Sequence, residues 1–254
     1  MRAMVEIPFY NRDCVFGYCK AVYPQVILPT RNPKSIFVDI GLRAAQEETP
    51  PLRSYASYII RLSKLYNAPI LAVVPDAFGD ANKNIASARE FLRIINNRFR
   101  GKQIKFLIVL HRLDGHVDEY RELVFRYLNY VDTGIAIPSR ESDVKEPTIK
   151  CKEVPRACAQ RIVWAVSRVA TGVLSGIHVH LLGALKPVLA SLIKDYNYVP
   201  NSFDTDAYRL VSNDKLRKEC LGDGRYMIDE NKCPPEVWAR EWLGELVRYI
   251  EVRV

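Results

Sequence analysis

The middle of the chain alternates between two hydrophobic patterns. Short apolar runs of about four to eight residues predict strands, and the longer segments between them repeat apolar positions every three or four residues, which predicts helices. The run SIFVDI at 35–40 is the first such strand, and the segment at 52–66 is the first such helix. Tyr55 and Ile59 share one face of that helix. The next run, APILAVVPD at 68–76, is continuously apolar, which is typical of a sheet buried on both faces.

Strands and helices continue to alternate toward the C-terminus. Further strands are predicted at 105–111, 133–139, 176–183 and 198–204. Helices are predicted at 80–97, 116–130, 156–174 and 186–196, with a closing helix at 234–251. One more strand is left open at QVILPT, 25–30. Regular alternation of this kind predicts a parallel sheet.

Two architectures contain such a sheet, the (β/α)8 barrel and the open doubly wound sheet. No GxGxxG or GxxxxGK[ST] motif follows any strand, so the usual nucleotide-binding signatures of open sheets are missing. The length of 254 residues fits a barrel. We therefore predict an α/β fold, a (β/α)8 TIM-type barrel in a single domain. It divides into an N-terminal segment at 1–34, a barrel core at 35–211 and a C-terminal extension with the closing helix at 212–254.

The composition of the chain indicates which class of partner it binds. The chain has 37 Lys and Arg against 29 Asp and Glu, a net charge of +8, and 48% hydrophobic residues. The hydrophobic share excludes disorder along the whole chain, and the positive charge favours a polyanionic partner such as a nucleic acid. No run of about 18 apolar residues occurs, and the N-terminus lacks the apolar region of a signal peptide. We therefore expect a cytoplasmic protein with no membrane partner.

The six cysteines do not predict a metal centre. None forms a CxxC pair, and neither Cys14 with Cys19 nor Cys220 with Cys233 has a nearby histidine to complete a structural zinc site. We expect buried or free thiols, with a disulfide as the open alternative, and no cofactor.

Most of the predicted strands end in a polar or ionisable residue. In a (β/α)8 barrel the active site lies at the carboxyl ends of the strands, and the residues that fall there are Asp39, Asp76, His111, Ser139 and Asp204. Carboxylates that converge in one cup suit a metal site, glycosidic-bond chemistry or recognition of the N–H donors of a purine. A basic surface around such a cup favours the last two together, because the cations hold a phosphate backbone.

Three segments share a further pattern with a known family. They are HLLGALKPVLASLIKDYNYVPNSFD at 180–204, FVDIGLRAA at 37–45 and VVPDAFGDANKNIASA at 73–88. Together they resemble the tRNA-guanine transglycosylase superfamily, which includes DNA transglycosylases that install 7-deazaguanines. Members of this family are (β/α)8 barrels that exchange a guanine base without breaking the phosphodiester backbone.

The resemblance implies a role for each matching residue. Asp204 would be the nucleophile, Asp39 a second catalytic aspartate that takes a proton from the incoming base, and Asp76 the residue that reads the guanine edge. The substrate pocket would include residues from the other matching segments: His111, Gly134, Ser139, Gly183 and Ser202. Contacts to the nucleic acid would come from the loops after two strands: Arg140, Lys145, Arg209, Lys215 and Arg217.

Two departures from the family pattern bear on the substrate. The tail lacks the CxCxxC…His zinc subdomain of the tRNA enzymes, and only Arg209 remains of their Pro-Thr-Arg segment, so DNA is favoured over tRNA. We expect a glycosyltransferase that inserts a 7-deazaguanine, as in queuosine or archaeosine modification, through an aspartyl-glycosyl intermediate, with a homodimer left open.

Two alternatives stay open, a catalytically degenerate barrel that only binds nucleic acid and a metal-dependent hydrolase. The hydrolase would use Asp39, Asp76, His111, His178 and Asp204.

Overall fold

The computed structural model describes most of the region in which strands and helices alternate. The described residues are 10–11, 14–15, 36–39, 52–66, 69–77, 79–98, 104–128, 131–139, 150–170, 177–204, 244–245 and 248. Among them, one parallel sheet contains the strands β3 (Ile36–Val38), β4 (Ile70–Val73), β5 (Ile104–Val109), β6 (Asp132–Pro138), β7 (His178–Leu182) and β8 (Ser202–Phe203). The helices that connect these strands are α2 (Leu52–Leu65), α3 (Ala81–Arg98), α4 (Val117–Leu128), α5 (Pro155–Ala170) and α6 (Lys186–Tyr196). A separate antiparallel sheet joins β1 (Tyr10–Asn11) and β2 (Cys14–Val15).

The strand order of the large sheet follows the chain. Each strand pairs in parallel with the next one, from β3 to β8, and each of the helices α2 to α6 lies in one of the five connections. A doubly wound sheet reverses its strand order at a switch point, so this order excludes that architecture for these six strands. The predicted alternation of strands and helices is confirmed over residues 36–204.

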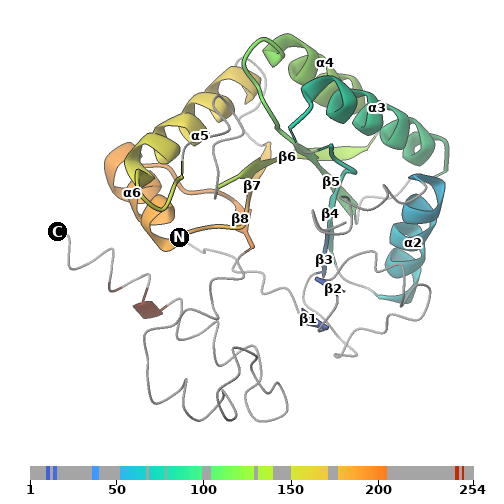
Figure 1. Cartoon of the computed structure of the whole chain (residues 1–254). Helices are drawn as coiled ribbons and strands as arrows, with labels where there is room; N and C mark the ends of the chain where they lie inside the picture. Colours follow the sequence, from blue (N-terminus) through green and yellow to red (C-terminus); the bar gives the residue numbers. More distant parts are fainter. Residues whose placement is uncertain are drawn as a thin grey trace.

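The sheet is curled, and Figure 1 shows the helices on its outer side. Phe37 of β3 stacks on His180 of β7 with ring centroids 4.6 Å apart, although β4, β5 and β6 lie between these two strands. Such distant strands make contact only if the sheet bends toward its inner face. The described strands therefore form a half-barrel. Closure into an eight-stranded barrel stays a prediction, because the strand predicted at 25–30 and most of the closing helix at 234–251 lie outside the described residues.

Hydrophobic side chains cover both faces of the half-barrel. On β4, Ile70 and Ala72 belong to the outer core, which the helices share. Leu71 and Val73 alternate with them and face the inner side. The inner cluster consists of Phe37, Leu71, Val73, Leu107, Val109 and Ala136. Burial on both faces explains why the strands are continuous apolar runs in the sequence and not alternating patterns.

The last strand is shorter than predicted. The segment at 198–204 forms only a two-residue strand, Ser202–Phe203. Helix α6 ends at Asn197 in the left-handed conformation, with φ of 48°, and Pro200 has no N–H to donate to a neighbouring strand. Hydrogen bonding to β7 therefore begins only at Asn201, whose backbone N–H donates to that strand.

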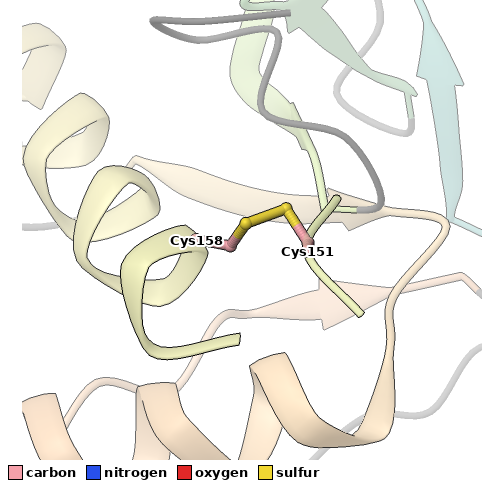
Figure 2. Close-up of a disulfide and its surroundings, with 2 residues drawn as sticks. All are labelled: Cys151 and Cys158. Atoms are coloured by element: carbon pink, nitrogen blue, oxygen red, sulfur yellow. A yellow bond between two sulfur atoms is a disulfide. The ribbon is translucent and has the colours of Figure 1, made fainter. Parts of the chain in front are cut away.

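A disulfide joins Cys151 and Cys158 (Figure 2). It links the turn before α5 to the first turn of that helix, and both residues are buried. The turn at 151–153 brings the two Cα atoms to 5.5 Å, within the range that a disulfide requires. The expectation of unpaired thiols is therefore wrong for these two residues, and the alternative of a disulfide is correct.

Reduction of this disulfide should lower the free energy of unfolding by about 2 kcal/mol, because a short cross-linked loop restricts the unfolded chain. The measurement is urea denaturation with and without a reductant. The double variant Cys151→Ala/Cys158→Ala is the control and should respond less to the reductant than the wild-type protein does. Equal unfolding midpoints for the oxidised and reduced wild-type protein would contradict a stabilising bridge.

Candidate functional site

The carboxyl ends of the six strands lie at one edge of the half-barrel, and polar residues predicted for that edge are found there. Each residue follows its strand directly or within a few positions: Asp39 after β3, Asp76 after β4, His111 after β5, Ser139 after β6, Gly183 after β7 and Asp204 after β8. This is the edge at which parallel α/β barrels carry their active sites. Within the group, Asp76 is paired with His111, and Asp204 lies beside Gly183.

Asp76 and His111 form a buried pair. Nε2 of His111 lies 2.7 Å from Oδ2 of Asp76, and the two side chains are 1% and 9% exposed, the imidazole being the more buried. A carboxylate in this position accepts the imidazole N–H and fixes the orientation of the ring. The pair connects the ends of two neighbouring strands, β4 and β5.

Two helix residues hold this pair in place from the outer side. Asn84 of α3 accepts a hydrogen bond from the N–H of Ala77 (3.2 Å) and donates to the carbonyl of Val109 (2.8 Å). Asn84 also donates to the hydroxyl of Tyr120 on α4 (2.7 Å), which in turn donates to the carbonyl of His111 (2.9 Å). Burial raises the pKa of Tyr120 to about 12, so this hydroxyl keeps its proton. One feature of the sequence indicates this network: Asn84 is a polar residue at a position where the helical periodicity predicts a buried hydrophobic side chain.

Tyr55 of α2 supports the neighbouring pair of strands. Its hydroxyl donates to the carbonyl of Val73 (2.8 Å) and lies 3.5 Å from that of Val38, the residue before Asp39. Burial raises the pKa of Tyr55 well above its ordinary value, and the carboxylates of Asp39 and Asp76 raise it further. Tyr55 is therefore a neutral donor that ties the ends of β3 and β4 together. Its position on a helical face indicated only a core residue.

Asp204 is held at the end of β8 by its side chain and its backbone. Oδ1 lies 3.0 Å from the backbone nitrogen of Gly183 and 3.0 Å from Nε2 of His180. The backbone N–H of Asp204 donates to Leu181, and its carbonyl accepts from Ala184. Among the described residues, both side-chain hydrogen bonds fall on Oδ1 and none on Oδ2, and the side chain is 16% exposed.

Asp204 belongs to a chain of hydrogen bonds along the inner face of β7 and β8. Nδ1 of His180 lies 2.8 Å from Oγ of Ser202, which lies 2.6 Å from Nε2 of His178. The two histidines point to the same side of β7, as their spacing predicts. Burial lowers the pKa of His178 to about 4, with His180 and Lys105 as smaller causes, so this imidazole is neutral at pH 7. The sequence pattern singled out His178, whereas the residue that contacts Asp204 is His180.

Three residues predicted for the substrate pocket have other neighbours in the structure. Gly134 lies inside β6 and not at its end, and a Cβ at this position would be 2.7 Å from the carbonyl oxygen of His178. Ser202 lies in β8 between the two imidazoles. Ser139 is buried, and its hydroxyl has no hydrogen-bond partner within the described ranges. The residues predicted to contact nucleic acid all lie outside the described residues: Arg140, Lys145, Arg209, Lys215 and Arg217.

The alternative of a metal-dependent hydrolase needs a cluster of ligands. In the part of the chain that the structure describes, no group of three His, Cys, Asp or Glu side chains is placed to hold a metal ion. Three of the residues predicted for that role fall into two separate pairs: Asp76 pairs with His111, and Asp204 pairs with His180, which the hydrolase prediction did not include.

Comparison with protein-family models, curated proteins and solved structures finds no match to this chain. One further finding concerns the helices: within the described ranges, none combines the length and the apolar character needed to cross a membrane.

His178 makes stability depend on pH in a defined interval. Its pKa is about 4 in the folded protein against 6.5 for an ordinary histidine, so between these values the unfolded chain binds more protons. The free energy of unfolding should therefore fall as the pH is lowered from about 6.5 to about 4. We expect His178 to contribute roughly 1 to 2 kcal/mol across this interval, less than the full shift implies, because the ring is only partly buried.

The measurement is urea denaturation of the wild-type protein and of His178→Gln at several values of pH. The substitution should flatten the slope, because it removes the group that titrates in this interval. Identical slopes for His178→Gln and the wild type would show that His178 is not the responsible group.

Proposed function

We propose that this chain is a glycosyl-transferring enzyme that exchanges a guanine base in a nucleic acid for a 7-deazaguanine, with Asp204 as the nucleophile. One observation carries the proposal. Two N–H donors hold Oδ1 of Asp204, whereas Oδ2 has no partner among the described residues and the side chain is partly exposed. An oriented carboxylate with one oxygen available suits attack on an anomeric carbon.

The reaction is a double displacement at C1′ of the target nucleoside. Oδ2 of Asp204 attacks C1′ while the bond to guanine N9 breaks, and the electron pair of that bond leaves with the base. Guanine leaves as its N9 anion and takes a proton from the solvent. Asp39 takes the proton from N9 of the incoming base, which then displaces Asp204 from C1′, and releases that proton to the solvent. Two inversions restore the original configuration, and the sugar stays covalently bound between them.

Asp76 is the residue that we assign to recognition of the base. The N1–H and amino groups of guanine are donors, and a carboxylate accepts both. His111 holds one oxygen of Asp76 in a fixed orientation. The hydroxyl of Tyr55 lies at the ends of β3 and β4, and the charges of Asp39 and Asp76 both raise its pKa, so the two aspartates assigned to proton transfer and base recognition are near each other.

A nucleic acid is the partner that the net charge of +8 favours. The target nucleotide has to leave its stack, because its C1′ and base edge are out of reach inside a duplex. The departures from the tRNA-enzyme pattern favour DNA. We further infer that the half-barrel is part of a complete single-domain (β/α)8 barrel.

Asp204→Asn should reduce base exchange by at least about 1,000-fold, because an amide is a far weaker nucleophile than a carboxylate. The measurement is incorporation of labelled guanine into DNA and tRNA side by side, with intact-mass detection of the covalent adduct. Asp118→Asn, which changes an exposed carboxylate on α4, is the matched control and should keep wild-type exchange.

Three measurements separate the proposed exchange from its two alternatives: the exchange assay, nucleic-acid binding at several salt concentrations, and metal analysis. Full exchange by Asp204→Asn would refute the role of Asp204. Salt-sensitive binding of nucleic acid by the wild type, without incorporation, would favour the degenerate binding barrel. Stoichiometric zinc or manganese in protein purified without added metal would favour the hydrolase.

Asp76→Asn should weaken binding of guanine and 7-deazaguanine by roughly 10- to 100-fold, because an amide oxygen and an amide N–H cannot accept both donors of the base. Equilibrium binding of the free bases measures this effect, and adenine is the control ligand. An unchanged dissociation constant for guanine would remove Asp76 from base recognition.

A further inference from the structure

A chain of three hydrogen bonds leads away from the Asp204 carboxylate, and the displacement chemistry above uses only its first residue. It runs from Asp204 through His180 and Ser202 to His178. His180 and Ser202 are 0% and 2% exposed. Polar groups this deeply buried are hydrogen-bonded in folded proteins, so each of these contacts has one donor and one acceptor.

The direction of the hydrogen bonds follows from the acceptor at the end of the chain. An ionised carboxylate only accepts hydrogen bonds, so His180 donates to Asp204 through Nε2–H. The other nitrogen of a neutral imidazole is an acceptor, so Nδ1 of His180 receives the hydroxyl proton of Ser202. The oxygen of Ser202 in turn accepts a hydrogen bond from Nε2–H of His178. Each of the four groups then has a single role.

Strand register sets the distances in this chain. His180 and Ser202 are direct partners across β7 and β8, and Asp204 follows Ser202 on the same side of its strand. The ring of His180 is stacked on Phe37, which reaches it from β3 across the half-barrel. The imidazole is therefore fixed by packing as well as by its hydrogen bonds.

We propose that His180 is the positioning residue of the nucleophile and that Ser202 supports its tautomer. His180 holds Oδ1 of Asp204 so that Oδ2 is turned toward the substrate, and the hydroxyl of Ser202 donates to Nδ1 of the tautomer that the carboxylate selects. The inference rests on the proposed base exchange, in which Asp204 attacks C1′. Serine, histidine and aspartate also form hydrolytic triads, but Ser202 is buried and hydrogen-bonded to both imidazoles, so it is not placed to attack a substrate.

The test compares two substitutions of His180 in the full chain. His180→Phe keeps a ring against Phe37 and removes both nitrogens, and we expect kcat for base exchange to fall about 100-fold with KM unchanged within about twofold. His180→Gln restores an N–H toward Asp204 and should recover about tenfold of that loss. The control is His116→Gln. His116 is not part of the chain of hydrogen bonds, so this variant should keep the wild-type kcat. Thermal unfolding of each variant shows whether its fold is intact.

A second measurement detects the tautomer without any turnover. Long-range 1H–15N correlation spectra of the wild-type protein, labelled in its imidazole rings, should show His180 protonated on Nε2 alone at pH 7. Protonation on Nδ1, or on both nitrogens, would overturn the inference whatever the activity.

The outcomes distinguish this inference from the proposed function. If the wild type exchanges the base through Asp204 and His180→Phe keeps its kcat, the positioning role is wrong and base exchange stands. If kcat falls but His180→Gln recovers none of it, the role as a hydrogen-bond donor is wrong. If the wild type exchanges no base on either nucleic acid, base exchange is wrong and the positioning role falls with it.

Discussion

Parallel pairing between consecutive strands is the constraint on which the site depends. Each strand of the half-barrel pairs in parallel with the next one along the chain. All six strands therefore run in the same direction, and all their carboxyl ends reach the same edge. Residues as far apart in the sequence as Asp39 and Asp204 thereby come to one end of the sheet. The connecting helices make this possible, since a parallel connection has to return the chain along the full length of the strand. One antiparallel strand in the series would move its terminal residue to the opposite end.

The inner face of the half-barrel is divided into an apolar and a polar part. Leu71, Val73 and their neighbours fill the part formed by β3 to β6, and the hydrogen-bonded histidines and serine occupy the part formed by β7 and β8. The stack of Phe37 on His180 is the contact between the two parts. An apolar environment makes an unpaired polar group costly and strengthens a hydrogen bond that is made. The same packing that buries these imidazoles therefore gives each of them a defined partner.

The periodicity of the chain was sufficient to predict the strands β3 to β8, the helices α2 to α6 and the residues at the carboxyl edge, because each of these depends on local pattern. It was not sufficient to predict their partners. The contacts of Asp76 with His111 and of His180 with Asp204 join residues on different strands, and strand register and curl decide them. Tyr55 shows the same limit, since its helical spacing predicts burial but not the carbonyl groups that its hydroxyl meets. The disulfide depends on a turn whose geometry left no periodic signal.

Gly134 has a consequence for how this sequence can change in evolution. A Cβ at this position would lie 2.7 Å from the backbone oxygen of His178 and 3.0 Å from the side chain of Leu107. A backbone oxygen is present whatever residue occupies position 178, so no substitution there makes room for a side chain at position 134. Only a separation of β6 from β7 would do so, and it would carry the histidines of β7 away from their present neighbours. Position 134 is therefore expected to stay glycine in descendants of this chain as long as β6 and β7 remain paired, whatever residues replace the histidines of β7.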